Sequence, residues 1–404
     1  MRRRTRLDWL AAAALALAAA GCDARAAEDA SRGDATLQVA QLPTPAGQGS
    51  AQPSLASADD ERVILTWHEP AEGGAALRMA TLDETGWSAP VTVAAGRDFI
   101  VNWADFPSAL PLGDGRLAVH WLEREGSDAY AYGVRLAFSN DGGATWSEPI
   151  RPHTDSTQTE RGFVSLLPAG DGVRAVWLDG RNFAAARPEM TLRSAVVSEA
   201  GLTEEALLDA RICDCCQTDA TVSAAGEVVV YRDRTEEEIR DISIVRRVDG
   251  QWTAPEVVHA DGWHIDGCPV NGPAVASRDG LVAVAWFTAA RDTAKVLLAV
   301  SQDGGASFAA PIRIDGGDPA GRVDVVLLED RTALVSWIEE TGDAAELRVS
   351  AVTPDGRTDP GVRVAAVSAA RSSGFARMAV TRGGAVIAWT DVDGATVRVA
   401  RLSR

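Results

Sequence analysis

The chain has 404 residues, a formal net charge of −18 and 46% hydrophobic residues, with no shift in composition between its two halves. A chain of this length is larger than one small core needs, so a single closed array of repeats explains it better than separate domains. The negative charge argues against nucleic acid as a partner and would repel an acidic polymer.

The N-terminus predicts export. Four arginines in the first six residues precede an apolar run, Leu10–Ala20, that is too short to span a bilayer as a mature helix. The run ends in Ala-Ala-Gly-Cys at residues 19–22, which resembles a bacterial lipobox, although Ala19 stands where that pattern prefers leucine. The resemblance implies a lipoprotein-type signal peptide over residues 1–22, lipidation of Cys22 and a periplasm-facing anchor in the cell envelope. A plain signal peptide cleaved nearby is the alternative.

Residues 23–50 are predicted to combine a tether with one strand. Residues 23–34 are rich in Ala, Asp, Glu, Arg and Gly and show no apolar periodicity, which is typical of a disordered linker. Residues 43–53 are also irregular. Between these two segments, Thr36–Leu42 predicts an isolated strand.

Seven aromatic residues recur at nearly constant spacing, each at the end of a short apolar run. They are Trp67, Trp121, Trp177, Tyr231, Trp286, Trp337 and Trp389, separated by 54, 56, 54, 55, 51 and 52 residues. In a chain of short strands, a period of this size predicts an all-β propeller with one four-stranded blade per repeat. We therefore predict seven blades over residues 51–404, with six blades as the alternative.

The last repeat contains strands at Phe375–Thr381, Ala385–Thr390 and Thr396–Leu402, and it lacks a fourth. The predicted strand at Thr36–Leu42 would supply it by pairing with residues near 396–402. The ring would then close without an open sheet edge.

The second repeat shows the order of strands within a blade. Its strands are predicted near Phe106–Leu112, Leu117–Leu122, Tyr132–Ser139 and Trp146–Arg151. Because successive strands are antiparallel, the loops that enter a blade and the loops between its second and third strands share one face. This face is named the mouth face below, and the other loops lie opposite.

Two loops between third and fourth strands fit the pattern Ser-x-Asp-x-Gly-x-x-aromatic. Their pattern residues are Ser139, Asp141, Gly143 and Trp146, and Ser301, Asp303, Gly305 and Phe308. Ser and Asp side chains can cap backbone N–H groups of such a turn, and Gly permits positive φ. The pattern resembles the Asp-box, or bacterial neuraminidase repeat, and the resemblance to the sialidase-like superfamily covers nearly all of residues 50–404. It implies the fold and leaves activity open, because the motif lies opposite the usual active face.

Sialidases of this superfamily use three arginines on the substrate carboxylate, a Tyr–Glu nucleophile pair and an Asp acid/base, on a six-bladed propeller. This chain lacks the Phe-Arg-Ile-Pro segment that carries the first of these arginines, and its only tyrosines are Tyr130, Tyr132 and Tyr231. No catalytic residue is therefore carried over by motif. We expect no sialidase activity, and a divergent exo-alpha-sialidase or other glycoside hydrolase is the alternative.

Polar residues follow the second strand of several repeats on the mouth face, most densely in YRDRTEEEIRD at residues 231–241. Their alternating charges would form surface ion pairs that contribute about 0–1 kcal/mol each. Alternatively, the arginines bind an anionic ligand and the carboxylates serve as acid or base. The weak catalytic candidates are Tyr231, Arg232, Asp233, Arg234, Asp179 and Arg181.

Four cysteines lie in the predicted propeller, Cys213, Cys215, Cys216 and Cys268. The first three lie in the loop that enters the fourth blade, and the last lies in the loop that enters the fifth, so they are predicted to meet on the mouth face. Their even number in an exported protein favours two disulfides. A bond between the neighbours Cys215 and Cys216 would be strained, so pairings that include Cys268 are preferred.

Two alternatives remain for these cysteines. Together with His264 they offer ligands for Cu(I) or Zn(II), although Cys-x-Cys-Cys is not a zinc-ribbon spacing. Crowded thiols at a mouth also permit a redox-active dithiol.

Three classes of function follow. We expect a monomeric, membrane-tethered propeller that holds a glycan, an anionic small molecule or a protein at a charged, cysteine-containing mouth. The alternatives are a divergent glycoside hydrolase and a periplasmic copper- or zinc-binding or redox protein.

Overall fold

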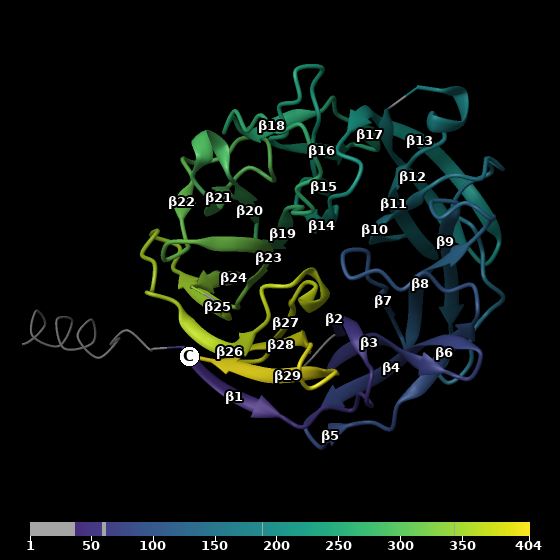
Figure 1. Ribbon diagram of the computed structural model, residues 1–404, viewed down its shortest axis with the longest axis horizontal. Helices are drawn as coiled ribbons and strands as arrows, with labels where there is room; N and C mark the ends of the chain where they lie inside the picture. The colour runs from purple at the N-terminus through teal and green to yellow at the C-terminus, as the bar shows by residue number, and fades with distance from the viewer. Residues whose placement is uncertain (1–36, 59–61, 188, 343) are drawn as a thin grey trace, which may run out of the picture. The chain divides into compact units, whose positions relative to one another are not determined.

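Seven antiparallel sheets follow one another around a common axis in the computed structural model (Figure 1). The structure describes residues 37–58, 62–187, 189–342 and 344–404, and Gln38–Ser403 form the propeller unit. The seven-bladed prediction is confirmed and the six-bladed alternative is wrong. The predicted signal peptide, tether and Cys22 lie outside the described residues. Within them, no helix is long and apolar enough to cross a membrane.

The first four blades follow in chain order. Blade one contains β2 (Ala51–Ala58), β3 (Arg62–Ala71), β4 (Gly74–Asp83), β5 (Gly86–Trp87) and β6 (Val91–Gly96). Blade two contains β7 (Ser108–Gly113), β8 (Arg116–Arg124) and β9 (Tyr132–Ser139). Blade three contains β10 (Arg161–Ala169), β11 (Gly172–Asp179), β12 (Met190–Ser198) and β13 (Gly201–Ile212). Blade four contains β14 (Asp219–Ser223), β15 (Gly226–Arg232), β16 (Ile242–Val248), β17 (Gln251–Trp252) and β18 (Glu256–His259).

The remaining three blades complete the ring. Blade five contains β19 (Ala274–Arg278), β20 (Leu281–Thr288), β21 (Lys295–Ser301) and β22 (Ile312–Arg313). Blade six contains β23 (Pro319–Leu327), β24 (Ala333–Thr341), β25 (Ala344–Val352) and β26 (Val362–Val367). Blade seven contains β27 (Arg377–Thr381), β28 (Gly384–Asp391), β29 (Thr396–Ser403) and β1 (Gln38–Leu42). In the part of the chain that the structure describes, three short 3₁₀ helices lie in loops, η2 (Phe183–Ala185), η3 (Ala290–Asp292) and η4 (Arg371–Ser373).

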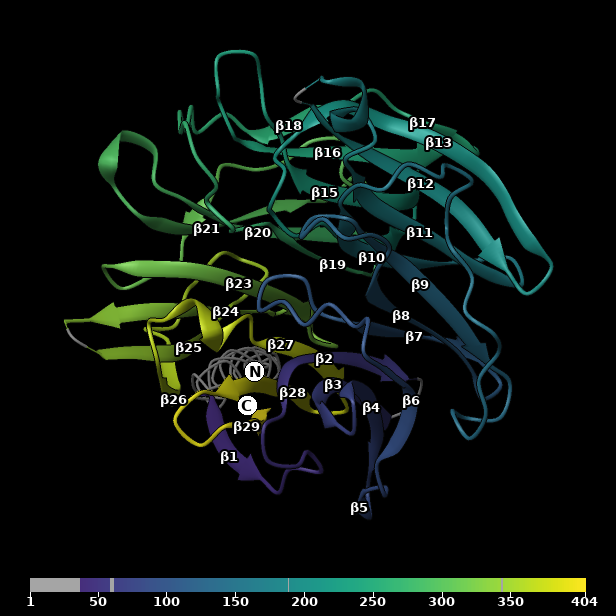
Figure 2. The same cartoon turned by 45° about the vertical axis from the view of Figure 1, so that its right-hand side comes forward.

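The strand β1 closes the ring. It pairs antiparallel with β29, from Gln38 opposite Ser403 to Leu42 opposite Val399. Figure 1 and Figure 2 show the two strands side by side. The first and last parts of the propeller thus share one sheet, which confirms the predicted closing strand and covers the edge of β29.

The seven periodic aromatic residues lie on the second strand of their blades and are at most 4% exposed. Trp177 of blade three, for example, packs in one cluster with Val134 and Leu136 of blade two. The aromatic period therefore follows from the fold, because each large side chain fills the space between one sheet and its neighbour.

Several of these indoles are held by a carboxylate two residues further along the chain. The indole N–H groups of Trp67, Trp121 and Trp177 donate to Glu69, Glu123 and Asp179 at 2.9, 2.7 and 2.8 Å. A buried indole N–H needs an acceptor. These acidic residues, which lie near the mouth-face ends of the second strands, therefore serve the packing of the blades.

The outermost strands are interrupted where the sequence has proline. The predicted fourth strand of blade two, Trp146–Arg151, forms only an isolated bridge between Leu136 and Ile150, so this prediction is wrong. Pro149 has no N–H to donate to a ladder. The outer strands of blades one and four are likewise divided on either side of Pro90 and Pro255.

The two Ser-x-Asp-x-Gly turns have the same hydrogen bonds. In the turn after β9, the Ser139 hydroxyl accepts the N–H of Gly143 at 2.8 Å, and the Asp141 carboxylate accepts the N–H of Thr145 at 2.9 Å. The turn after β21 repeats these contacts with Ser301, Asp303, Gly305 and Ser307. Gly143 has φ of +91°, and a Cβ there would meet the Met79 side chain at 2.2 Å. Glycine is therefore required at this turn.

The blades are tied to one another near the axis. Carboxylates at the first strands of blades two, four and six accept a backbone N–H from the first strand of the next blade. The pairs are Asp105 with Phe163, Asp219 with Val275, and Asp324 with Met378, at 2.8, 2.9 and 2.6 Å. These side chains continue the hydrogen bonding from sheet to sheet where no ladder connects them.

Candidate functional site

A disulfide joins two loops of the mouth face. The loop between β13 and β14 carries Cys213, Cys215 and Cys216, and the loop between β18 and β19 carries Cys268. Cys215 and Cys268 are bonded, and their Cα atoms are 6.1 Å apart. The blade order brings these segments together across 53 residues of sequence, and the bond ties blade four to blade five.

Two free thiols lie beside this disulfide. Cys213 and Cys216 are buried and unbonded, with their Sγ atoms 3.2 Å apart. The Sγ of Cys213 is 3.9 Å from that of Cys215 and accepts a hydrogen bond from Nη1 of Arg240 at 3.3 Å. The structure thus holds one disulfide and one dithiol in a single cluster, where the sequence favoured two disulfides.

The two buried thiols differ in acidity. The hydrogen bond with Cys216, assisted by the positive charge of Arg240, lowers the pKa of Cys213 to about 6. Burial raises the pKa of Cys216 well above its ordinary value. At neutral pH the pair therefore holds one thiolate and one thiol, which is the state in which a dithiol reacts.

The cysteines are also the residues that could hold a metal. The sulfur atoms of Cys213, Cys215 and Cys216 lie within 4.8 Å of one another, and this group does not include the exposed His264. With Cys215 bonded to Cys268, two thiols are free. Two thiols 3.2 Å apart suit a dithiol better than a four-coordinate zinc site.

Arg232 and Tyr231 are structural anchors beneath the mouth. The Arg232 guanidinium lies 4.8 Å above the ring of Trp263 and donates to three backbone carbonyls, those of Arg240, Asn271 and Phe287, at 2.5, 2.8 and 2.7 Å. The Tyr231 hydroxyl donates to Asp209 at 2.6 Å, and both side chains are at most 2% exposed. These contacts position the loops that carry the cysteines.

Asp233 and Arg234 are also engaged within the protein. Asp233 accepts a hydrogen bond from Ser243, and burial raises its pKa to about 6. Arg234 pairs with Glu238 at 2.8 Å and with Asp214 at 3.4 Å. Ion pairs therefore hold the loop at 233–241 together, as expected if its alternating charges pair with one another.

Asp179 and Arg181 form part of a buried charge cluster. Asp179 accepts hydrogen bonds from the indole of Trp177 and from Arg161 and Arg181, at 2.8, 3.1 and 2.8 Å. Although burial opposes it, the Arg181 hydrogen bond and the Arg161 charge hold the pKa of Asp179 well below its usual range. An anion held this firmly is suited to holding the blade together rather than to proton transfer.

A group of aromatic side chains lies at the centre of the ring on the mouth face. Trp103 stacks on Phe375 with ring centroids 6.2 Å apart, and Phe106 lies 5.9 Å from Phe375. This set of three residues is named the aromatic plug. It comes from the loops that enter blades two and seven, which reach the middle of the ring in Figure 1, and it packs on Phe163.

Polar contacts fasten the aromatic plug. Gln217, next to the cysteine loop, donates to the carbonyl of Ala104 at 2.6 Å. Arg322 lies 5.3 Å from the Trp103 ring and donates to the carbonyls of Ala369 and Ala370. The plug is therefore part of the folded core, and it occupies the axial position beside the cysteines.

A carboxylate group that the sequence did not single out lies between blades two and three. The Tyr132 hydroxyl donates to Glu160 at 2.6 Å, and burial raises the pKa of Glu160. Asp105 is buried, its Oδ2 has no hydrogen-bond partner among the described residues, and burial raises its pKa to about 8. The sequence contains a pattern that could have identified Asp105, because Asp105, Asp219 and Asp324 recur at about twice the spacing of the periodic aromatic residues.

An axial cavity of about 410 Å³ is lined by β14, β19, β23 and β27. Arg377 lies in its wall, 3.1 Å from Asp324 and 3.9 Å from Asp219. Burial raises the pKa of Asp324 to about 6, against the charge of Arg377. The arginine and the two carboxyl groups offset one another's charge, so charged side chains can be buried on the inner strands of the propeller.

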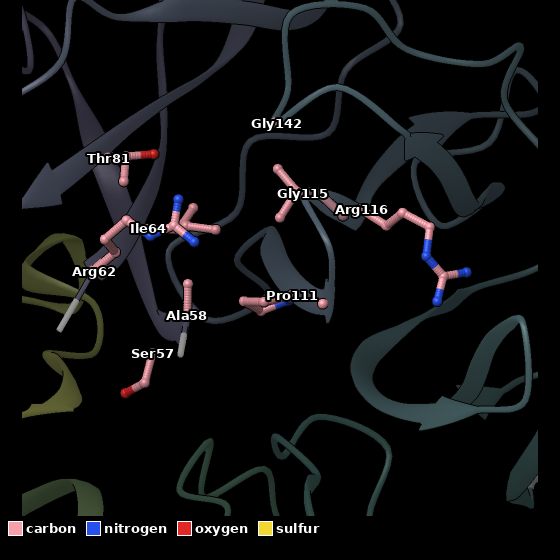
Figure 3. A pocket seen from close by; sticks show the side chains of 11 residues that line it. Ser57, Ala58, Arg62, Ile64, Thr81, Pro111, Gly115, Arg116 and Gly142 are labelled. Atoms are coloured by element: carbon pink, nitrogen blue, oxygen red, sulfur yellow. The ribbon is translucent and has the colours of Figure 1, made fainter. Parts of the chain in front are cut away.

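A second cavity, of about 290 Å³, lies opposite the mouth face between blades one and two (Figure 3). Its lining includes Arg62, Thr81, Pro111 and Arg116, and the part of the lining that the structure describes contains no carboxylate, cysteine or histidine. The candidate groups for acid–base or metal chemistry described above lie elsewhere in the propeller.

No family model and no curated protein matches the chain. Solved structures with a similar fold include a PL25 polysaccharide lyase, an ulvan lyase, with TM-score 0.57 and 11% identity over 89% of this chain and 95% of that chain. AofleA from Arthrobotrys oligospora matches with TM-score 0.51 and 12% identity over 82% of this chain and 91% of that chain.

NanB sialidase from Streptococcus pneumoniae aligns with TM-score 0.46 and 11% identity, over 90% of this chain and 70% of that chain. At such identities a likeness concerns the course of the backbone, and site residues have to be argued from this chain itself. The chain is thus similar in fold to solved structures that include a polysaccharide lyase.

Proposed function

We propose that this protein is an exported, lipid-anchored propeller that binds a glycan on its mouth face and has no sialidase activity. The observation that carries the proposal is a group of three exposed apolar side chains in neighbouring mouth-face loops. Val101, Tyr130 and Phe183 are 48, 66 and 38% exposed, and all three lie in mouth-face loops of blades two and three. Exposed aromatic rings beside polar groups are suited to stacking on sugar rings.

The aromatic plug supports binding without sialidase chemistry. A substrate bound at the axis of this face would have to displace Trp103, Phe106 and Phe375, which pack in the core cluster of blade three. The buried arginines nearby are already engaged, as Arg232 and Arg322 donate to backbone carbonyls. Among the residues that the structure describes, a sugar carboxylate would find no free arginine triad there. We therefore place the glycan at the rim of the mouth face, which is formed by Val101, Tyr130 and Phe183.

Polysaccharides are the ligands we would test first. An ulvan lyase with a similar propeller is described in complex with -[GlcA(1-4)Rha3S]-. This chain has a net charge of −18, so an acidic polymer would meet overall repulsion and binding should strengthen with added salt. A neutral polysaccharide should show little salt dependence, which separates the two ligand classes.

Substitution of the rim aromatics tests glycan binding. Tyr130→Ala and Phe183→Ala should each weaken binding on a polysaccharide array by roughly tenfold, since a stacked ring contributes about 1 kcal/mol or more. Val257→Ala, which changes a 52% exposed side chain on β18, is the matched control. Full binding by the Tyr130→Ala, Phe183→Ala double variant would refute the rim as the site.

Glycoside hydrolysis is the second candidate, favoured by the Tyr132–Glu160 hydrogen bond and by the nearby Asp105, whose pKa burial raises to about 8. A raised carboxyl pKa is what a general acid for glycosidic oxygen requires. The test is turnover of fluorogenic sialosides and of polysaccharides by the wild type and by Glu160→Gln. Turnover that Glu160→Gln abolishes would establish an enzyme, whereas no turnover alongside binding supports the first proposal.

The anchor is tested separately. Cys22→Ser should move the exported protein from the membrane fraction to the soluble fraction, or block its maturation. Unchanged membrane partitioning of an exported Cys22→Ser variant would contradict lipidation at this residue and leave glycan binding unaffected.

A further inference from the structure

The cysteine cluster combines an accessible disulfide with a buried dithiol. Cys268 is exposed and Cys215 is half-buried, whereas Cys213 and Cys216 are at most 2% exposed. An external reagent can therefore reach the disulfide but not the dithiol. The Sγ atom of Cys213, 3.9 Å from that of Cys215, connects the two.

We infer that these four cysteines form an internal thiol–disulfide relay. The Cys215–Cys268 pair exchanges with an external thiol or disulfide, and the Cys213–Cys216 pair takes over the disulfide by internal exchange. The relay uses residues apart from the rim aromatics, so it does not rest on glycan binding. Cys268 is the contact residue, and the partner class is a small thiol or its disulfide.

The internal step exchanges one disulfide for another. The Cys213 thiolate attacks Sγ of Cys215, the Cys215–Cys268 bond breaks, and Cys268 leaves as a thiolate that takes up a proton. Cys216 then loses its proton and attacks Sγ of Cys213, the Cys213–Cys215 bond breaks, and Cys215 leaves as a thiolate that takes up a proton. The dithiol has become the Cys213–Cys216 disulfide, and Cys215 and Cys268 are thiols. No external oxidant or reductant is consumed, because one disulfide is lost and one is formed.

The surrounding charges favour Cys213 as the attacking group. Arg240 donates to its sulfur, and Arg232 lies on the adjoining strand β15. The acidic groups on the other sides are Asp214, which lies 3.8 Å from Arg240, and Glu238, which holds Arg240 at 2.8 Å. Arg240 is thus a positioning residue, fixed by Glu238 and aimed at Cys213. A thiolate kept next to a disulfide by a guanidinium reacts faster than a neutral thiol.

A disulfide map of the chain with all four clustered cysteines intact is the first test. The full chain would carry Cys22→Ser, so that the four clustered cysteines are its only thiols. After equilibration with dithiothreitol and its oxidised form, alkylation and peptide mass spectrometry of the folded protein should find a Cys213–Cys216 bond together with alkylated Cys268. A protein in which Cys213–Cys216 never forms while Cys215–Cys268 opens and closes would overturn the relay.

Two variants resolve the steps. Cys216→Ser removes the resolving thiol, so Cys213–Cys215 should accumulate with Cys268 open to alkylation. Cys213→Ser should leave Cys215–Cys268 intact and Cys268 unreactive in the absence of reductant. Circular dichroism and thermal unfolding identify any variant that fails to fold, and the wild-type map remains decisive in that case.

The pH dependence tests Arg240. In Cys216→Ser, the rate at which Cys268 becomes reactive should rise with pH as the Cys213 thiol ionises. Adding Arg240→Gln should move this rise to higher pH and slow exchange on its rising part by roughly tenfold, while Arg240→Lys should restore part of the rate. An unchanged pH profile would remove Arg240 from the relay.

A metal centre is the competing outcome. Reduced protein would be purified anaerobically and incubated with Cu(I) or Zn(II), followed by dialysis and metal analysis. Stoichiometric metal that is lost in Cys213→Ser and protects all four cysteines from alkylation, with no exchange in the metal-free protein, would replace the relay by a thiolate metal site.

Discussion

Arginine carries most of the buried positive charge in this molecule. Lys295 is the only lysine among 39 basic residues, and arginines at 161, 174, 232 and 240 are at most 4% exposed. A guanidinium can hold several acceptors in fixed directions, which an ammonium group cannot. The side chains of the candidate residues that the sequence placed in a polar pocket are already bonded within the protein, because their donors are directed at its own carbonyls and carboxylates.

Arg232 provides a test at this scale. Arg232→Ala would remove the donors that serve the carbonyls of Arg240, Asn271 and Phe287, leaving them buried without these bonds. We expect a loss of about 3 kcal/mol in the free energy of unfolding, measured by urea denaturation. Arg401→Ala, at an exposed position of β29, should change stability by less than about 0.5 kcal/mol. Equal stability of the two variants would contradict the anchoring role.

Asp105 gives a prediction with a definite pH sign. Its pKa is about 8 in the folded protein against an ordinary 3.8, so the folded state binds its proton more tightly than the unfolded state does. The stability from Asp105 is complete below about pH 4 and is lost as the pH rises towards 8. Asp105→Asn cannot ionise, and it should gain about 3 kcal/mol over the wild type between about pH 5 and pH 8. Parallel pH profiles from urea denaturation would contradict this.

At the scale of elements, the sequence predicted what repeats and missed what arises between repeats. The aromatic period and the incomplete last repeat predicted seven blades and the pairing of β1 with β29, because each blade meets the same packing requirement. The meeting of the two cysteine loops follows from blade order alone. Two features could not be predicted from the sequence: that Cys268 forms its disulfide with Cys215, and that three aromatic side chains form the aromatic plug. Both depend on how loops from different blades meet in space.

The strand β1 is the element whose removal tests ring closure. Deleting residues 23–43 should expose the edge of β29 along its pairing with Gln38–Leu42. We expect Tm to fall by roughly 5 °C or more, measured by calorimetry. Deleting residues 23–36 keeps β1 and is the control, which should retain the wild-type Tm. If both deletions leave Tm unchanged, β1 does not stabilise the ring.

At the scale of the whole molecule, closure makes each blade depend on two neighbours. Hydrogen bonds from Asp105, Asp219 and Asp324 link first strands across three junctions, and the disulfide adds a covalent tie between blades four and five. In an open array of repeats, terminal units can fray while the centre stays folded. Here β1 joins the last blade to the start of the propeller, so no blade is terminal. The propeller should therefore unfold as one unit.

Weakening a single junction tests this cooperativity. The Asn271 side chain accepts the N–H of Arg322 at 2.7 Å and donates to the carbonyl of Ala320, which connects blades five and six. Asn271→Ala should lower the Tm of the entire propeller by a few degrees and keep one calorimetric transition, because opening one junction removes the closure on which all blades depend. Gln251→Ala, at an exposed position of β17, is the control and should leave Tm unchanged. Two separate transitions in Asn271→Ala, with only part of the heat at the lower temperature, would show that the blades unfold independently and that closure does not couple them.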